Sequence, residues 1–319
     1  RCRQMAIAAN TTMFHLLMGW PCDGLGDWPF HPVSLGGKTY RAQEVLGPQT
    51  VLADATVTLL PGMSTYVGAD ITAGIWQCGL ASSDDVSLFV DLGTNGEMVL
   101  GNKDQRFIAS APAGPALEGG KLTWGTGSVP GAICGVRIER GRAKVRTIDH
   151  AVPVGICGTG ILEAMAGLVR EGLVDKTGKL VEPYFHKGFP LASTLDYQRI
   201  TLSQQDIREI QMAKSAIRAG IESLIERSGI SRQRIHQVFL AGGFGYYLDP
   251  QKAAVIGLLP ADLAERTTAV GNTSLKGAIG LLTGAVTLEE LQAIAAGAEE
   301  IVLGNDEAFQ RLYIDYLNF

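Results

Sequence analysis

One stretch constrains the fold of this chain more than any other: Val86–Gly101, with the sequence VSLFVDLGTNGEMVLG. An apolar run ends on Asp91, a turn with two glycines follows, and a second apolar run begins at Met98. Because both runs are short and bounded by turn residues, the pattern predicts the two strands of a β-hairpin. The turn has more flexibility than a bare hairpin turn requires.

The residue types in this turn suit a phosphate group. Glycines let backbone N–H groups approach an anion closely, and threonine and asparagine add side-chain donors. The predicted phosphate contacts are Gly93, Thr94, Asn95 and Gly96. Asp91 would repel phosphate directly, but it can hold Mg²⁺ through water. The stretch is neither a P-loop nor a dinucleotide fingerprint, since no helix follows, and an ordinary glycine-bearing hairpin is the alternative.

Composition narrows the class of protein. A chain of 319 residues can hold one large domain or two of ordinary size. A net charge of −5 without a basic run argues against nucleic-acid binding. No apolar stretch reaches the length of a membrane span and no signal peptide is visible. The five cysteines are widely spaced without a CxxC pair, which predicts reduced thiols in the cytoplasm rather than disulfides or a metal site.

Two parts of the sequence repeat one pattern. Residues 63–71 and 272–280 each place a small polar residue before a predicted helix that carries a Gly-Ala pair. Small residues on a helix face let a second helix cross closely. The repeat predicts that the two helices meet at a hinge between two similar lobes, with coincidence in a Gly/Ala-rich chain as the alternative.

Two further glycine loops and one long helix are candidates for nucleotide contacts. A predicted strand at 236–241 leads into a loop whose backbone could lie against a base or phosphate: Gly242, Gly243, Phe244 and Gly245. A second loop opens a helix, where free N–H groups attract anions: Gly158, Thr159 and Gly160. In the long helix 203–228, Lys214 falls in the apolar stripe, so it either extends to solvent or faces a bound base or ribose.

Two acids are candidates for catalysis. Glu118 lies in a glycine-rich loop, where it could orient water or serve a metal, although such an acid is more often solvated. Asp70 lies in the first predicted hinge helix and could face a cleft, with a surface position as the alternative. The histidines form no pair with metal-ligand spacing.

Seven motifs together resemble the reductive activators of corrinoid proteins, over nearly the whole chain. They are AANTTMFHLLMG, LPGMSTYVGADITAGI, FVDLGTNGEMVLG, APAGPALEGG, GICGTGILEA, IREIQMAKSAIRAGIE and VFLAGGFGYYLDPQKAAVIGLLP. The resemblance implies an α/β, actin-like (ribonuclease H-like) two-lobed ATPase fold around a cleft for ATP and Mg²⁺. It also implies that ATP hydrolysis is linked to the reduction of Co(II) to Co(I) on the corrinoid protein of a methyltransferase system.

The resemblance assigns roles to particular residues. It makes 91–97 the second phosphate loop and Gly242–Gly245 the adenosine loop. Helices at 61–76 and 272–282 would connect the lobes. Three side chains of the long helix would lie beside the base: Gln211, Lys214 and Arg218.

The sequence also departs from that family. The first phosphate loop is absent, so we expect a truncated first lobe at 1–80, a second lobe at 81–284 and a C-terminal helical and strand extension at 285–319. The clustered cysteines of an iron–sulfur domain are absent too, so a [2Fe–2S] centre is expected only in a missing N-terminal domain, and the ATPase of this piece is expected to be weak or absent.

The sequence is compatible with three functions for this chain. The first is the ATP-binding domain of a corrinoid-protein activator, with a homodimer left open. The chain has no Asp-x-His-x-x-Gly pattern, so we do not expect it to bind cobalamin itself. The second is a small-molecule kinase of the same fold that uses Asp70 or Glu118. The third is a nucleotide switch that binds without hydrolysis.

Overall fold

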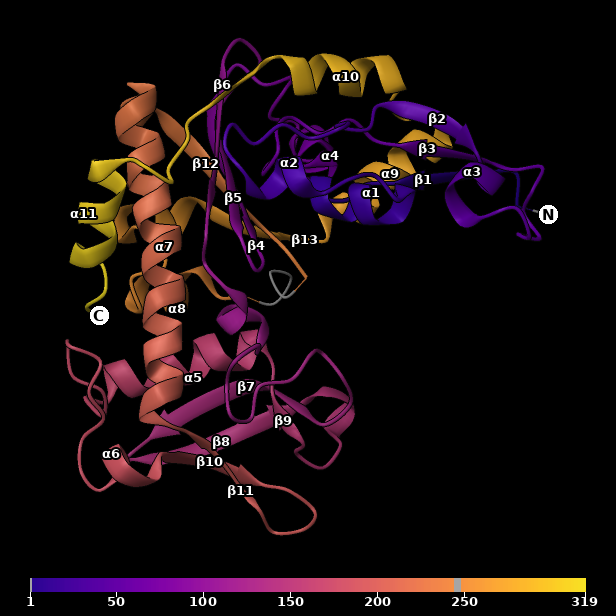
Figure 1. Ribbon diagram of the computed structural model, residues 1–319. Coiled ribbons are helices and arrows are strands. Elements are labelled where there is room, and N and C mark those ends of the chain that lie inside the picture. The colour runs from indigo at the N-terminus through magenta and orange to yellow at the C-terminus, as the bar shows by residue number, and fades with distance from the viewer. Residues whose placement is uncertain (1, 244–247) are drawn as a thin grey trace.

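The computed structural model describes residues 2–243 and 248–319. Its central element is a six-stranded sheet in the order β13-β12-β4-β5-β6-β14. Figure 1 shows these strands in the upper half of the molecule beside the long helix α7. The strands are β4 (Val86–Leu92), β5 (Gly96–Gly101), β6 (Arg106–Ala111), β12 (Ile235–Ala241), β13 (Thr267–Gly271) and β14 (Ala298–Glu300).

The predicted hairpin is confirmed as β4 and β5, which pair antiparallel. β6 continues the antiparallel run, whereas β12 pairs parallel to β4 and β13 parallel to β12. Parallel strands place their carboxyl ends at one edge, so Gly242, which follows β12, lies against the end of β4 at Leu92. Two of the predicted glycine loops therefore meet at that edge.

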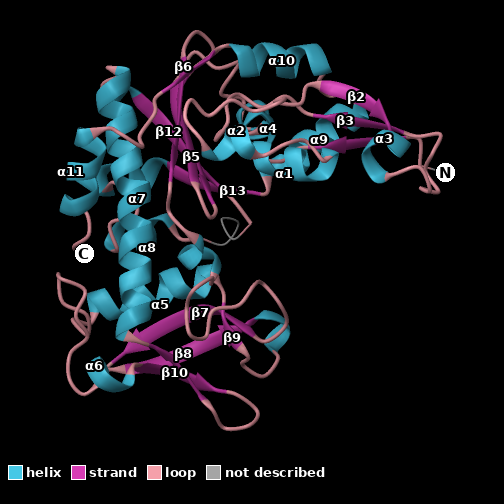
Figure 2. Cartoon of the chain, viewed as in Figure 1, coloured by secondary structure: helices cyan, strands magenta, loops and turns pink. Residues whose placement is uncertain are grey.

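A smaller sheet system forms the lower part of the molecule, below α5 (Figure 2). One sheet has the order β8-β7-β9 and a second pairs β10 with β11. The elements are β7 (Ala132–Glu139), β8 (Arg142–Thr147), β9 (Gly155–Ile156), α5 (Gly158–Arg170), α6 (Tyr184–Lys187), β10 (Phe189–Ser193) and β11 (Arg199–Leu202).

The N-terminal residues form an arm that extends away from the central sheet (Figure 1). Its three strands have the order β1-β3-β2, with β1 parallel to β3. The elements are β1 (Gln4–Ile7), α1 (Thr11–Met18), α2 (Asp23–Gly26), β2 (Lys38–Arg41), α3 (Ala42–Leu46), β3 (Thr56–Leu59) and α4 (Ala69–Gln77).

Helix α7 (Gln204–Ser228) runs beside the central sheet and down to the lower sheet system (Figure 1), and capping residues mark both of its ends. Ser203 and Asp206 form a reciprocal capping box, and Gly229 ends the helix in the left-handed region. A second capping box, formed by Thr287 and Glu290, begins α10. The remaining helices are α8 (Pro250–Val255), α9 (Thr273–Thr283), α10 (Leu288–Ala296) and α11 (Glu307–Asp315).

The two helices predicted to meet are α4 and α9, and they cross in direct contact. A Cβ added to Gly277 would lie 2.3 Å from the Cβ of Ala73, and one added to Gly280 would lie 2.3 Å from the ring of Trp76. Only glycine fits these two positions without movement of the neighbour. The core of the arm also includes side chains from one face of the central sheet, such as Phe89 and Val99.

One local prediction was wrong. The helix predicted over 61–76 begins only at Ala69, because Pro61, Gly62 and Gly68 keep the preceding segment irregular. Nearby, β2 ends at Arg41, where α3 begins. The domain bounds 1–80, 81–284 and 285–319 stay a prediction, although β14 of the last segment pairs with β6 of the central sheet.

Candidate functional site

The turn between β4 and β5 is the first part of the site. The register pairs Asp91 with Glu97, and the turn closes with a 3.1 Å hydrogen bond from Gly93 N–H to the carbonyl of Asn95. Thr94 and Asn95 are exposed at its tip. A Cβ on Gly96 would lie 2.0 Å from Cδ1 of Ile217, so glycine lets α7 pack against the hairpin.

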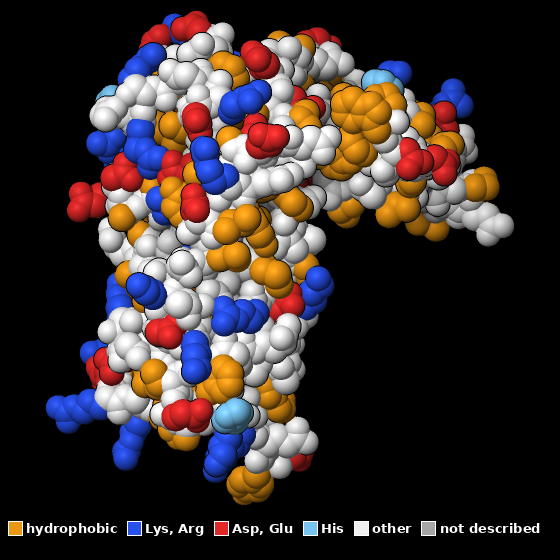
Figure 3. Space-filling model, turned by 60° about the vertical axis from the view of Figure 1, so that its left-hand side comes forward, with side chains coloured by type: hydrophobic (Ala, Val, Ile, Leu, Met, Phe, Trp, Pro, Cys, Tyr) orange, Lys and Arg blue, Asp and Glu red, His pale blue; other side chains and the backbone are white. Residues whose placement is uncertain are grey.

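A cavity of about 230 Å³ lies beside this turn, between the arm and the central sheet. Figure 3 shows the molecule hollowed beneath the arm. The cavity has walls from both lobes: Ala8, Ala9, Asn10, Met13, Asp70, Asp91, Gly242, Gly243, Asn272 and Ser274. The structure thus brings four predicted site residues, Asp70, Asp91, Gly242 and Gly243, to one cavity. We call this cavity and the turn at 93–96 the phosphate end of the site.

The phosphate end is strongly acidic. Burial, with the nearby charges of Asp70 and Glu118, raises the pKa of Asp91 to about 7. Burial also raises the pKa of Asp70, whose Oδ1 accepts a hydrogen bond from Ile71 N–H at 3.1 Å. Among the described residues that line the cavity, none is a lysine or arginine. No lysine or arginine among these described lining residues therefore neutralises the acids.

The acidic residues of the phosphate end suit the ligand preferences of Mg²⁺. Mg²⁺ keeps several waters and takes one or two carboxylates, with the remaining ligands from phosphate oxygens. Asp91 is the candidate ligand, since it lies at the strand end and has an acid on either side. No group of three or more metal-ligating side chains was found in the part of the chain that the structure describes, so a dedicated protein cage is not the arrangement here.

Glu118 is attached to the hairpin turn. Its Oε2 accepts a 2.6 Å hydrogen bond from the Thr94 hydroxyl, and Glu118 is the last residue of a short 3₁₀ helix, Pro115–Glu118. The side chain is exposed, so it can face a bound phosphate or water. Thr94 and Glu118 thus act as one unit, in which the acid orients the hydroxyl.

The two other glycine loops, which follow β12 and begin α5, meet at a second cavity through Gly243 and Thr159. Gly242 has φ +116°, and a Cβ there would lie 2.4 Å from the carbonyl oxygen of Leu92, so this contact with β4 requires glycine. Phe244 and Gly245 lie outside the described residues. Gly158, Thr159 and Gly160 begin α5, and Thr159 and Gly243 line a neighbouring cavity of about 430 Å³.

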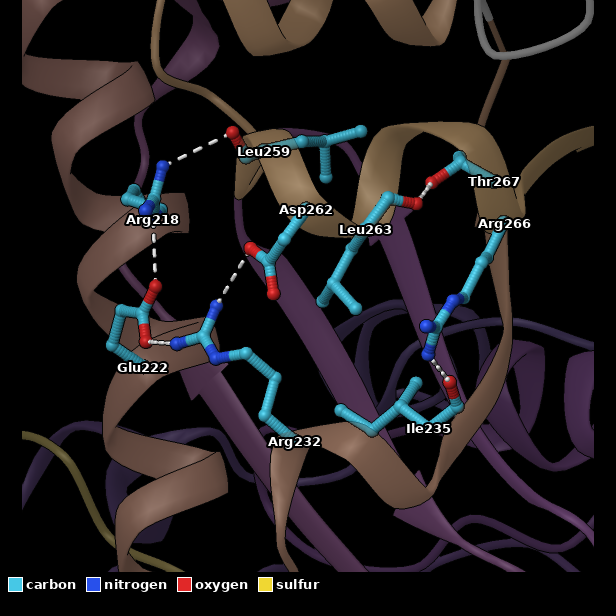
Figure 4. A network of polar contacts seen from close by, with 9 residues as sticks. All are labelled: Arg218, Glu222, Arg232, Ile235, Leu259, Asp262, Leu263, Arg266 and Thr267. Atoms are coloured by element: carbon cyan, nitrogen blue, oxygen red, sulfur yellow. Dashed lines mark hydrogen bonds and ion pairs between the residues drawn. The ribbon is translucent and has the colours of Figure 1, made fainter.

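The three predicted base contacts occupy a different environment. Gln211, Lys214 and Arg218 line one face of α7, and their side chains contact residues 316–319 and the segment after α8. Figure 4 shows the Arg218 guanidinium between the carbonyl of Leu259 and the carboxylate of Glu222. We call this face of α7 the base end. A base contact for these residues stays a prediction.

Sequence reasoning missed two residues of the phosphate end. Glu97 is 9% exposed, and burial, with the charges of Asp70 and Asp91, raises its pKa to about 8. Asn10 caps α1 through Met13 N–H and also lines the cavity. The alternation of the β5 strand and the Asn-Thr-Thr turn after β1 were the available signals, but neither shows which acid or amide faces a cavity.

Two hydrophobic cores, the crossed helices α4 and α9, and glycine turns beside an acid-lined cavity are the features expected of an actin-like fold. A family model described as the C-terminal domain of RACo, the ASKHA domain, matches residues 85–319, and one described as the RACo middle region matches residues 1–83. The chain belongs to the RACo family. The predicted actin-like fold and the resemblance to corrinoid-protein activators are confirmed.

Named relatives agree with this assignment. The chain is 33% identical to the corrinoid activation enzyme RamQ of Eubacterium limosum, over 98% of this chain and 55% of the relative. It is 28% identical to the [Co(II) methylated amine-specific corrinoid protein] reductase of Methanosarcina barkeri, over 90% of this chain and 56% of the relative.

A solved structure gives the same result. It is a reductive activator for corrinoid, iron–sulfur protein that superposes with a TM-score of 0.93 and 33% identity, over 99% of this chain and 52% of its own. The chain spans about half the length of these relatives. No helix within residues 2–243 and 248–319 is long and apolar enough to span a membrane.

Proposed function

We propose that this chain is the ATP-dependent part of a corrinoid-protein reductive activator, and that it binds MgATP at the phosphate end. The observation that carries the proposal is the cavity that Asp70 and Asp91 line beside the glycine turn at 93–96. Its acids repel a bare triphosphate, and a Mg²⁺ ion between the acids and the phosphates would replace that repulsion with attraction to the ion. The family match and the names of the relatives support the reductive role.

Each residue of the phosphate end has a proposed task. Backbone N–H groups of the turn at 93–96 hold phosphate oxygens, with Thr94 positioned by Glu118 at 2.6 Å. Asp91 holds Mg²⁺ through water, and the ion supplies positive charge against the phosphates. Asp70 and Glu118 are the two acids able to orient an attacking water, Asp70 from the cavity wall and Glu118 from the turn. Gly242 and Gly243 leave room for the ligand.

The electron has to come from elsewhere. All five cysteines of this chain are free, and none of the described residues forms a metal-binding group. We propose that a [2Fe–2S] centre outside these 319 residues supplies the electron. ATP turnover at the phosphate end would change the angle between the lobes and with it the affinity for the partner.

The proposed partner is the corrinoid protein of a methyltransferase system, reduced from Co(II) to Co(I). A cytoplasmic location and a homodimer stay predictions. The free cysteines support the cytoplasmic location, because structural disulfides are rare in the cytosol.

The test uses the full-length protein, reductant and the Co(II) corrinoid protein, with Co(I) followed by its absorption. We expect Co(I) formation to depend on ATP and to be lost in Asp91→Asn. Equal Co(I) formation with and without ATP would reject the coupling. Tight ATP binding without phosphate release would instead support the switch, and ADP release that requires a small hydroxylated substrate would support the kinase, for which Asp70 is the acid in the cavity.

A further inference from the structure

Residues 316–319 lie in the base end of the site. They follow α11, which packs along α7 through the buried side chain of Phe309 and through a hydrogen bond from the Ser215 hydroxyl to the carbonyl of Tyr313. We call residues 316–319 the 316–319 segment. Figure 1 shows α11 beside α7, with the segment descending along that helix.

The segment contacts all three residues that the family resemblance places beside the base. The side-chain amide of Gln211 donates to the carbonyl of Leu317 at 2.8 Å, and the ammonium of Lys214 donates to the carbonyl of Asn318. The Arg218 guanidinium lies over the ring of Tyr316 at 4.6 Å. Lys214 also lies 5.0 Å from the ring centre of Phe319, and it is only 1% exposed.

We call the space that holds the 316–319 segment the base slot. Its walls come from three parts of the chain. Arg218 donates to the carbonyl of Leu259 at 3.0 Å, and a Cβ on Gly257 would lie 3.3 Å from the Lys214 ammonium. On the other side, Phe319 N–H donates to the carbonyl of Lys176 at 2.9 Å. The slot thus lies between α7, the segment after α8, and the lower part of the molecule.

The slot is close to the phosphate end. Ile217 touches the glycine turn at Gly96, and it lies on the same stretch of α7 as Lys214 and Arg218. Residues three or four apart on a helix are neighbours. A nucleotide with its phosphates at the turn would therefore direct its base toward the residues that now hold the segment.

The segment offers the chemistry that a base and ribose would offer. A base presents a flat π-surface to a guanidinium, and the ring of Tyr316 does so here. A base and ribose present acceptors to amide and ammonium donors, and the carbonyls of Leu317 and Asn318 do so here. Both ligands need the same donors, and Gln211 already uses its own on Thr177 and Leu317.

We propose that the 316–319 segment occupies the base slot and competes with the base of the nucleotide, so that ATP binding has to displace it. This inference rests on the proposed function, since it assumes that ATP binds at the phosphate end. A site that is open only part of the time has its apparent affinity reduced by the open fraction. The segment then sets the nucleotide affinity, and bound nucleotide releases the segment in return.

The test compares two ligands on the full-length protein. ATP has a base and inorganic tripolyphosphate has none, and both are used with Mg²⁺ in calorimetric titrations. Removal of residues 316–319, or the double substitution Tyr316→Ala and Phe319→Ala, should tighten ATP binding about 5- to 100-fold, the range typical of coupled sites. Tripolyphosphate affinity should stay within about twofold of the parent, because the phosphate end is untouched. Ile314→Ala, on an exposed position of α11, is the matched control.

The outcomes separate this inference from the proposed function. Unchanged or weaker ATP binding without the segment overturns the competition, and weaker binding identifies the segment as a wall of the base pocket. If ATP and tripolyphosphate affinities are the same in the parent and in Asp91→Asn, the proposed function fails. Hydrogen exchange of residues 316–319 gives a second measure that needs no variant. ATP should raise their exchange rate, and stronger protection contradicts the inference.

Discussion

The two ends of the candidate site differ in how their polar groups are satisfied. At the phosphate end, Asp70, Asp91 and Glu97 lie close together without a cation, and burial raises the pKa of each. At the base end, Gln211 and Lys214 already have partners in the 316–319 segment. The acids of the phosphate end therefore repel one another, whereas the donors of the base end already form hydrogen bonds within the protein.

This difference separates two sources of nucleotide affinity. Binding at the phosphate end relieves repulsion that the protein already holds, so a magnesium complex gains from acids that cost stability without it. Binding at the base end exchanges one set of contacts for another, so its net gain is small. We therefore expect variants of the phosphate end to have larger effects than variants of the base end.

The largest effect should come from Asp91→Asn. The substitution removes the proposed magnesium ligand while it keeps the size of the side chain. By the scale of other single electrostatic groups in active sites, phosphate release from ATP should fall about 100- to 1,000-fold. Phosphate release is measured on the full-length protein, with the exposed Asp196→Asn as control. Loss of less than about threefold would remove Asp91 from the proposed role.

The contact between the turn and α7 should show the next largest effect. Gly96→Ala places a Cβ 2.0 Å from Cδ1 of Ile217, and such overpacking costs about 1–3 kcal/mol. The melting temperature should fall by several degrees in a thermal-unfolding scan. Gly127→Ala, where nothing lies within 4 Å, should leave it unchanged. Ile217→Val should restore part of the loss, and its failure to do so would show that Gly96 acts through another contact.

The buried acids should make stability fall as the pH rises. The pKa of Asp91 is raised to about 7 and that of Glu97 to about 8, so the folded protein holds these protons more tightly than the unfolded chain. From about pH 4 upward, the free energy of unfolding should decrease until both groups are ionised. Glu97→Gln should raise the melting temperature by a few degrees at pH 9 and change it little at pH 5. The same gain at both pH values would contradict the electrostatic explanation.

The smallest effect is expected at the base end. Lys214→Ala should weaken ATP binding by less than about threefold while the 316–319 segment is present, because the ammonium then serves the segment. Without the segment the same substitution should cost about tenfold, since the donor becomes available to the nucleotide. A double-mutant cycle on calorimetric affinities measures the difference. Equal costs in both backgrounds would mean that the segment and the base do not share Lys214.

Short sequence signals were enough to predict much of this structure. The hairpin followed from two bounded apolar runs, and α7 from its capping box at Ser203 and Asp206 and from Gly229. The crossing of α4 and α9 followed from glycine and alanine on their faces. Each of these signals lies within a few residues of the feature that it specifies.

Long-range contacts were not predictable in this way. The sequence placed Lys214 in an apolar stripe, but its partner Asn318 is more than 100 residues away, and no local pattern links them. Glu97 occurs in a strand whose neighbours are all buried, so its position beside Asp91 needed the register of the sheet. The helix predicted over 61–76 was too long because its small residues were interpreted as helical throughout, whereas Gly68 holds an extended backbone.

The glycine-lined crossing of α4 and α9 has a mechanical consequence. The crossing brings Ala73 against Gly277 and the ring of Trp76 against Gly280, so the two helices approach closely at both contacts. Packed helices can move by small sliding displacements, which is a shear motion. A displacement of a fraction of an ångström there would be amplified with distance along the arm, so its outer strands would sweep much further.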